Sequence, residues 1–301
     1  MQAFKVVQMQ TAREVAGELE SPDYLKNKAL WDALLPQDDP QLRHSTPGSI
    51  DSLSMKDVKD YYNKVFRPDL TAIVVTGKVN PDSAKSIIEK YFSAWNSQGE
   101  KPPTEYSSVP NNKPATINVP DKSRVQDEVT LAQMLQLTRG NPAYYVLQLS
   151  NQILTREVFA ARLYKDLRVN TGLVYYVHSG FSIGKTRSYF QIMYGCDPPN
   201  VFKAKSVIVR DLKDIQNNPV TNKELRRAQS AELRDVQLSE SSVSSIARGL
   251  LSRSIHQLPL NEPTIAAKHY LDVKPADIQD AYKKWLRPDD FVLVSQGPNP
   301  K

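Results

Sequence analysis

The sequence of 301 residues has few of the residue types that build metal sites, redox centres and disulfides. Its one cysteine, Cys196, excludes an internal disulfide and a thiolate metal site. The four histidines, His44, His178, His256 and His269, are far apart, and no two have the i, i+4 spacing that places two imidazoles on one helix face. We therefore expect no zinc-binding helix in this chain, and structural or solvated roles for its histidines.

Other functional classes are excluded by what else is missing. There is no glycine-rich phosphate loop and no nucleophile elbow, and Cys196 has no histidine near it in sequence, so we interpret it as an inert residue at a strand end. No apolar run approaches the roughly 18 residues of a membrane span. The net charge is +6, but Lys and Arg alternate with Asp and Glu along the whole chain, which argues against a nucleic-acid interface.

The strongest pattern that is present is an internal repeat. Met55–Asp69 followed by Thr71–Gly77 recurs as Pro275–Asp289 followed by Phe291–Gly297. Each stretch predicts an amphipathic helix that ends at Arg-Pro-Asp, because proline cannot continue a helix, and then a short β-branched strand that ends at glycine. The identical residues share one constant offset of 220 positions: Asp57/Asp277, Asp60/Asp280, Tyr62/Tyr282, Arg67/Arg287, Pro68/Pro288, Asp69/Asp289 and Gly77/Gly297.

This offset predicts the domain organisation. If the second copy begins near Pro114, a full first copy would begin well before Met1, so we expect the front of the first copy to be missing. Residues 98–114 are rich in proline and polar residues and lack apolar periodicity, as an extended linker does. We predict residues 1–97 as the C-terminal half of a first repeat, 98–114 as a linker and 115–301 as a complete second repeat.

Within the second copy, strands are predicted early and helices late. The alternation at Val129, Leu131, Leu135 and Leu137 predicts a strand, and Asn141-Pro142 predicts the start of a helix that bears Val146, Leu149 and Ile153 on one face. A second helix is expected to reach about Leu167. The next strand should carry Tyr175, Val177 and Phe181 on one face and Val174 and Tyr176 on the other, with Tyr189–Tyr194 as its hairpin partner. Further helices are predicted around 201–215, 221–238, 243–255 and 263–270.

This order of elements predicts an α+β fold in each repeat, a mainly antiparallel sheet covered by helices.

The segment Ala160–Tyr175 resembles one in the C-terminal half of pitrilysin/insulinase-type zinc peptidases, relatives of mitochondrial processing peptidase. Phe66–Asp69 with Ile73–Val79, and Asn217–Leu225, are similar to the same family, and the similarity extends over essentially the whole chain. The resemblance implies duplicated mitochondrial-processing-peptidase-like domains arranged as two halves of a clamshell.

The resemblance also implies where zinc would lie. In that family an early domain holds zinc through an inverted His-x-x-Glu-His helix and a later glutamate, and this sequence contains no His-x-x-Glu-His. Glu14 stands roughly where the later glutamate would, but one carboxylate falls short of the three protein ligands that a catalytic zinc needs, so we interpret it as a solvated helix residue. The chain therefore resembles the non-zinc, C-terminal portion of such an enzyme, with any zinc in a missing catalytic half or a partner.

The resemblance implies a substrate-binding role for two residues. The non-zinc half of the family contributes an arginine and, seven residues later, a tyrosine, which match Arg168 and Tyr175. Their implied role is to hydrogen-bond the scissile carbonyl and its developing oxyanion. The alternative is a surface arginine and a half-buried strand tyrosine. Two departures favour that alternative: Leu154–Val158 stands where the family often has a glycine run, and Val169 where it commonly has glutamate.

Two hypotheses for function follow. In the first, the chain is the substrate-binding, non-zinc C-terminal half of a zinc endopeptidase, whose partners are a peptide substrate and a zinc-bearing half or partner subunit. In the second, it is a non-catalytic structural or docking subunit that kept the fold and lost the chemistry. The sequence leaves a homodimer and the cellular compartment open, and the resemblance favours the bacterial periplasm or cell envelope.

We predict that this chain alone binds no stoichiometric zinc and hydrolyses no peptide, because its histidines cannot converge by local spacing. Metal analysis of the dialysed protein and a peptide-library assay with and without chelator would check this. One zinc per chain, or cleavage that a chelator abolishes, would contradict it.

Overall fold

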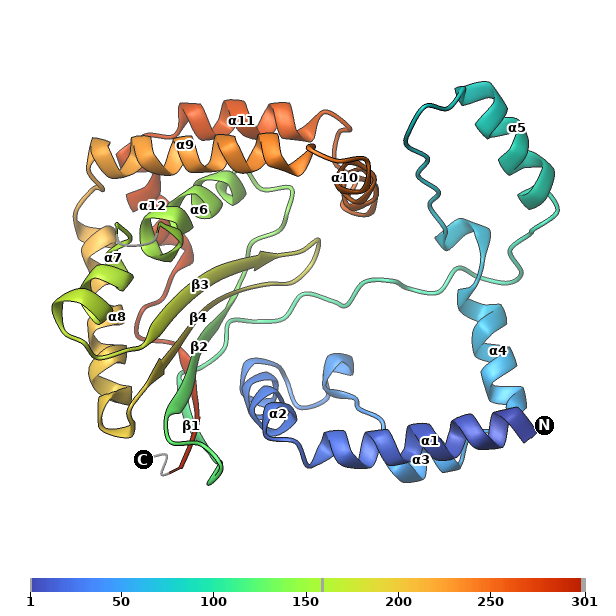
Figure 1. The fold of residues 1–301 in the computed structure, drawn as a ribbon, viewed down its shortest axis with the longest axis horizontal. Coiled ribbons are helices and arrows are strands. Elements are labelled where there is room, and N and C mark those ends of the chain that lie inside the picture. Colours follow the sequence, from blue (N-terminus) through green and yellow to red (C-terminus); the bar gives the residue numbers. More distant parts are fainter. Residues whose placement is uncertain (1, 158–159, 299–301) are drawn as a thin grey trace. The chain divides into compact units, whose positions relative to one another are not determined.

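The computed structural model describes residues 2–157 and 160–298, which separate into two units (Figure 1). Unit 1 contains the chain up to Glu18, His44–Glu105 and Asp235–Glu262. Unit 2 contains Leu19–Arg43, Tyr106–Arg234 and the chain from Pro263 onward. All of the strands in the described ranges belong to unit 2.

Unit 2 is built on one mixed five-stranded sheet with the order β1-β5-β2-β4-β3. β1 pairs with β5 in parallel, and the other three pairings are antiparallel. The predicted α+β fold is confirmed, although β1 was not predicted from the sequence. The strands are β1 (Ala115–Pro120), β2 (Asp127–Leu135), β3 (Tyr176–Ile183), β4 (Ser188–Cys196) and β5 (Val292–Gly297).

β5 is an interior strand of this sheet, between β1 and β2, and its sequence suits this buried position. All six residues of Val292–Gly297 are buried, because β1 and β2 pair with its two edges and helices cover both of its faces. Its first three residues, Val-Leu-Val, form the apolar run expected of a strand buried on two sides. Gly297 is required at its end, since a Cβ there would lie 2.3 Å from Oδ1 of Asp127.

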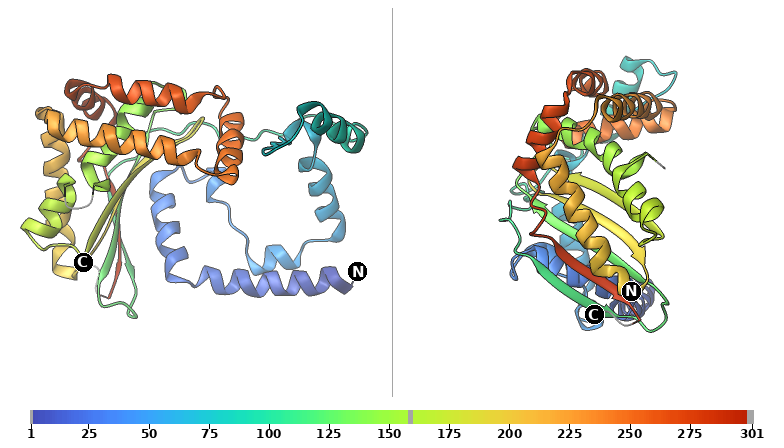
Figure 2. Two further views of the ribbon diagram at one scale, coloured as in Figure 1. Left: turned by 45° about the horizontal axis from the view of Figure 1, so that its top comes forward. Right: turned by 90° about the vertical axis from the view of Figure 1, so that its left-hand side faces the viewer.

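One face of the sheet is covered by α2 (Pro22–Leu34), which begins at Ser21, whose Oγ accepts a hydrogen bond from the amide of Tyr24. Leu30 and Leu34 of this helix pack in one core cluster with strand residues Ala132, Met134 and Val294. Figure 2 shows α2 on one side of the sheet and the remaining helices of unit 2 on the other.

The opposite face carries the larger core. Rings stack across it from β3 to the residue before β5: the Phe181 and Phe190 centroids are 4.4 Å apart, and those of Phe190 and Phe291 are 6.2 Å apart. Tyr282 of α12 is fully buried. The helices of this side are α6 (Ala143–Asn151), α7 (Arg162–Tyr164), α8 (Val201–Asn217), α9 (Asn222–Ser239), α11 (Glu262–Asp272) and α12 (Pro275–Trp285), with the π-helical turns η3 (Gln152–Arg156) and η4 (Lys165–Asn170) and the 3₁₀ turn η5 (Pro198–Asn200).

A half-buried ion pair ties α7 to the start of α9. Nε and Nη2 of Arg162 donate to Oε1 and Oε2 of Glu224 at 2.7 and 3.2 Å, and Nη1 donates to Asp214 of α8 at 2.9 Å. Burial raises the pKa of Glu224, but hydrogen bonds from Arg162 and from the Thr221 amide and hydroxyl outweigh it and lower the pKa to about 2. The pair thus fixes three helices around one guanidinium.

Unit 1 consists of helices and turns in the described ranges. Gln8 of α1 is buried, and its Nε2 donates to the carbonyls of Ile50, Asp51 and Leu53. These hydrogen bonds supply partners for carbonyls at the C-terminal end of α3. Arg67 is buried and bound to Asp69 and to the carbonyls of residues 98–100. The helices are α1 (Gln2–Leu19), α3 (Pro47–Asp51), α4 (Met55–Val65), α5 (Pro81–Phe92) and α10 (Val243–Ile255), with 3₁₀ turns η1 (Pro40–Leu42, in unit 2) and η2 (Pro68–Leu70).

The strand predicted at Thr71–Gly77 is not formed, and that expectation was wrong. α4 ends at Val65 before Arg67-Pro68, as predicted, but the residues after η2 adopt no strand structure. A strand needs a neighbour for its amides and carbonyls, and none of the described residues of unit 1 is in a strand. Ile73 and Val75 are correspondingly exposed.

The Arg162–Glu224 pair predicts an acid-labile packing of α7 on α9. Because the pKa of Glu224 lies at about 2 in the folded chain, below the ordinary 4.5 of a glutamate, its stabilisation is present above pH 4.5 and is lost as pH falls toward 2. Glu224→Gln should remove up to about 3 kcal/mol of this pH-dependent stability. Thermal unfolding from pH 7 to pH 2.5 measures it, with Glu20→Gln as the exposed control; equal pH profiles for the two variants would contradict the prediction.

Candidate functional site

The predicted substrate-binding pair lies on the connection from η4 to β3. Leu167 and Val174 are buried, and the carbonyl of Leu167 accepts hydrogen bonds from the amides of Leu173 and Val174 at 2.8 and 3.4 Å. Gly172 has φ of 62°, the left-handed conformation that glycine adopts without a steric penalty, and this residue turns the chain back toward the sheet. The two buried anchors leave the side chains of Arg168 and Tyr175 on the surface.

Arg168 and Tyr175 lie next to each other. Nη1 of Arg168 donates to the carbonyl of Val174 at 3.2 Å, and its guanidinium carbon is 5.8 Å from the centroid of the Tyr175 ring. The Tyr175 side chain is 44% exposed and Arg168 is exposed too. A guanidinium and a phenol, both hydrogen-bond donors, are therefore presented to solvent at one place.

Asp197 completes this arrangement and was not found from the sequence. Oη of Tyr175 donates to Oδ1 of Asp197 at 2.8 Å, and this hydrogen bond is the main reason why the pKa of Tyr175 is raised above 10. The phenol is therefore protonated at neutral pH. The signal in the sequence was the hairpin: with Tyr176 opposite Gly195, the residue before β3 must lie near the residue after β4.

The predicted position of Tyr175 on the strand is corrected by the structure. β3 begins at Tyr176, and Tyr175 precedes it, although its amide donates to the carbonyl of Gly195 at 2.8 Å. Val177 and Phe181 are both buried, as two residues on one strand face can be, but Val174 is buried as well, whereas Tyr175 is exposed. The turn after Gly172 breaks the alternation, because period-two alternation holds only within a strand. Tyr176 is exposed, stacks on His178 and covers Gly195.

The stretch that departs from the family's glycine run is held in place. Oγ1 of Thr155 accepts a hydrogen bond from the amide of Ser179 on β3 at 3.0 Å. Arg156 pairs with Glu232 at 3.8 Å and Glu157 with Arg227 at 3.3 Å, both on α9. These contacts fix the polypeptide where glycines would leave it free. Val158, the last residue of the stretch, lies outside the described residues, and Val169, the second departure, is exposed.

The remaining candidate ligands stay separate. Glu14 is exposed on α1, His178 stacks on Tyr176, His269 stacks on Tyr145 at 4.4 Å, and His256 contacts the carbonyl of Ser252 through Nδ1. His44 is exposed before α3. Across residues 2–157 and 160–298, no three His, Cys, Asp or Glu side chains come together in a group that could hold a metal ion.

Cys196 is fully buried at the end of β4. Its burial, reinforced by the nearby carboxylates of Asp127 and Asp197, raises the pKa of the thiol to about 12. A thiol with this pKa stays protonated at neutral pH and is a poor nucleophile. None of the described helices is long and apolar enough to cross a membrane.

Comparison with known proteins agrees with this architecture. The family model described as "Peptidase M16 inactive domain" matches residues 52–232. A peptidase M16 inactive domain from Pseudomonas fluorescens superposes with a TM-score of 0.84 at 22% identity, over 100% of this chain and 72% of that one. A protease from Helicobacter pylori gives 0.83 at 20% identity, over 99% and 72%. The periplasmic protease PqqL from Escherichia coli gives 0.76 at 15%, over 98% and 33%. No protein in a search of curated sequences matches the chain.

The Tyr175–Asp197 hydrogen bond predicts a titration shift. Asp197→Asn removes the negative charge that stabilises the neutral phenol, so the pKa of Tyr175 should fall. NMR titration of ring-labelled tyrosine measures this, with Tyr175→Phe to assign the signal and Asp38→Asn as the exposed control. An unchanged pKa of Tyr175 in Asp197→Asn would show that the bond does not form in solution.

Proposed function

Because the chain belongs to the peptidase M16 inactive domain family, we propose that it is the substrate-binding partner of a zinc-bearing half, with Arg168 and Tyr175 as the residues that contact the peptide. The zinc and the attacking water belong to that other half. This chain contributes hydrogen-bond donors that hold the peptide carbonyl, and by itself it should not hydrolyse peptides.

The observation that carries the proposal is the placement of two donors at one exposed point. The guanidinium of Arg168 lies over the ring of Tyr175, and the raised pKa of Tyr175 keeps its proton available. Such donors stabilise charge that develops on a carbonyl oxygen when water attacks. Asp197 holds the phenol in the unbound state, and a substrate oxygen would take its place as acceptor.

The same proposal includes a tandem repeat whose first copy is incomplete. Helices of equal length recur at the 220-residue offset, to within one residue. α1 and α9 have 18 residues each, α2 and α10 have 13, and α4 and α12 have 11. Equal lengths at equal spacing support a duplication, with the linker at 98–114 and the second copy at 115–301.

Exposed apolar residues in unit 1 support the view that part of the first copy is absent. Ile278 and Tyr282 of α12 are fully buried, whereas their counterparts Val58 and Tyr62 of α4 are 44% and 54% exposed. Ala72–Gly77, the counterpart of β5 at the 220-residue offset, has no strand beside it among the described residues. A preceding segment that supplied a parallel strand on one side and an antiparallel strand on the other would complete the unit. That segment would also be the place for the inverted zinc motif.

The alternative is a docking or structural subunit that has lost its role in chemistry. It is favoured by the fixed stretch around Thr155 and by exposed Val169, where the family's more flexible and more acidic residues are replaced. The two functions differ in what Tyr175 does once a zinc half is present.

The deciding experiment measures peptide hydrolysis by the chain joined to its zinc-bearing half. Tyr175→Phe removes one oxyanion donor and should lower kcat by about a hundredfold or more, roughly 2.7–4 kcal/mol, without affecting folding. Arg168→Ala should act similarly and also raise KM through lost binding of a carbonyl.

Tyr176→Phe is the matched control, since Tyr176 is the residue after Tyr175 and its ring packs over Gly195 on the sheet. Equal activity of the Tyr175 and Tyr176 variants would refute the substrate-binding role and leave the docking subunit. Circular dichroism of all three variants excludes misfolding as the cause of a loss.

A further inference from the structure

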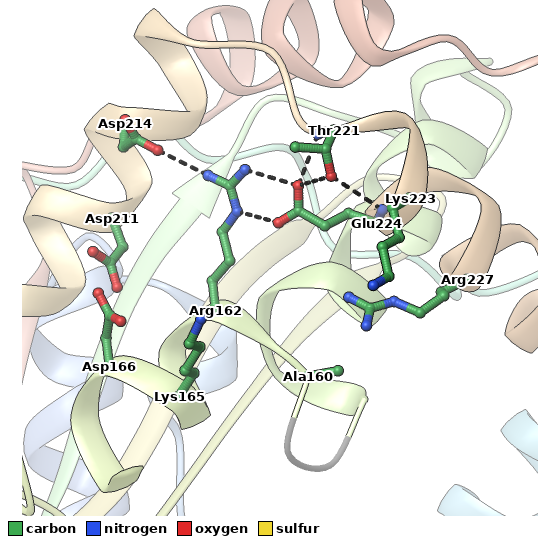
Figure 3. Close-up of a pocket in the computed structure, with 10 residues that line it drawn as sticks. All are labelled: Ala160, Arg162, Lys165, Asp166, Asp211, Asp214, Thr221, Lys223, Glu224 and Arg227. Atoms are coloured by element: carbon green, nitrogen blue, oxygen red, sulfur yellow. Dashed lines mark hydrogen bonds and ion pairs between the residues drawn. The ribbon is translucent and has the colours of Figure 1, made fainter. Parts of the chain in front are cut away.

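A charged pocket of about 410 Å³, whose lining does not include Arg168 or Tyr175, lies in unit 2 between α7, η4, α8 and the start of α9 (Figure 3). Four basic and four acidic side chains line it. Ion pairs within the protein satisfy only some of them. What the pocket could bind therefore depends on which charges keep unused hydrogen-bonding capacity.

The centre of the pocket is fully paired. Arg162 binds both oxygens of Glu224 and one oxygen of Asp214, and Glu224 also accepts from the amide and the hydroxyl of Thr221. Figure 3 shows Arg162 extending between the other charged residues, with Asp166 and Asp211 to one side and Lys223 and Arg227 to the other. The pair therefore divides the pocket into an acidic end and a basic end.

The acidic end holds a buried carboxylate with an unused oxygen. Asp211 of α8 is 6% exposed; its Oδ1 accepts from Nε and Nη2 of Arg210, and its Oδ2 has no hydrogen-bond partner among the described residues. Asp166 of η4 faces it and is bound by the same guanidinium of Arg210. Two carboxylates thus share one cation, and a buried acceptor without a partner costs free energy that a bound donor would recover.

The basic end holds cations with unused donors. Lys223 and Arg227 stand four residues apart on α9 and so lie on one face of that helix. Arg227 is paired with Glu157 through Nε at 3.3 Å, and Lys223 makes no ion pair among the described residues. Lys223 stands in the first turn of α9, where the helix dipole also favours a bound anion, and Arg227 follows one turn later.

We propose that this pocket binds a short peptide with free ends, its ammonium group at Asp211 and Asp166 and its carboxylate at Lys223 and Arg227. Three N–H donors of an ammonium would satisfy Oδ2 of Asp211 and reduce the repulsion between the two carboxylates. A carboxylate would accept from Lys223 and from the free guanidinium nitrogens of Arg227. The site does not depend on the role of Arg168 and Tyr175, and short peptides are the class of product that a peptidase assembly releases.

The ionisation of Asp211 sets the pH range of binding. Burial raises its pKa to about 6, against the lowering effect of the hydrogen bonds from Arg210; Asp166 raises it further and Arg162 lowers it. Asp211 is therefore ionised at pH 7.5 and protonated at pH 5. An ammonium group should bind at the higher pH and weakly at the lower.

The test is calorimetry or NMR titration of the full chain with dialanine at up to about 10 mM, at pH 7.5. N-acetyl-dialanine lacks the ammonium and dialanine amide lacks the carboxylate, and each should bind about tenfold more weakly or worse. No binding of dialanine, or equal binding of the blocked peptides, would overturn the proposal.

Two variants assign the ends. Asp211→Asn should lower the affinity for dialanine but should not lower the affinity for N-acetyl-dialanine any further. Lys223→Gln should likewise lower the affinity for dialanine but should not lower the affinity for dialanine amide any further. Exposed Asp38→Asn and Lys203→Gln are the controls and should bind like the parent. If either pocket variant lowered the affinity for all three ligands equally, the assignment of the ends would be wrong. Thermal unfolding of each variant establishes that it is folded.

Discussion

The insertion of β5 between β1 and β2 is the interaction on which the rest of unit 2 depends. It is the one strand hydrogen-bonded to both of these neighbours and packed by helices on both faces, and all six of its residues are buried. Without it, β1 would lose its pairing in the sheet and α2 would lose Val292 and Val294 from its core cluster. The hairpin of β3 and β4, whose register brings Tyr175 to Asp197, is attached to β5 through β2.

The same constraint explains the difference between the units. α4 and α12 have matching sequence patterns and matching lengths, yet only α12, which packs against α6 and α8, buries its apolar face. Amphipathic periodicity and a proline stop are local properties, and both copies show them. Burial is a property of the surroundings, and the described part of unit 1 offers no sheet to cover. The exposed Tyr62 and Ile73 of unit 1 are residues that the proposed preceding segment would cover.

What could be predicted from the sequence follows the same division between local properties and the surroundings of an element. The helices at 201–217 and 243–255, the β3–β4 hairpin and the end of α4 before Pro68 followed from periodicity and proline, which act over a few residues. β1 was missed because it is short, half-exposed and identified only by its parallel partner β5. Thr71–Gly77 has the composition of a strand, but among the described residues it has no neighbouring strand to pair with. At the candidate site, Arg168 and Tyr175 came from a resemblance, whereas Asp197 and the charged pocket at Asp211 needed the three-dimensional pairing of distant segments.

The distance along the chain between β5 and its partners also has a consequence for biosynthesis. Ser295 donates to Asp127, which lies 168 residues earlier. While a ribosome is still making the helices in between, β1 and β2 have been released without their central neighbour, and α2 has no complete surface to cover. Contacts this remote in sequence form slowly, and open strand edges invite pairing with other chains in the meantime. The nascent chain is therefore most open to mispairing before β5 emerges and closes the sheet.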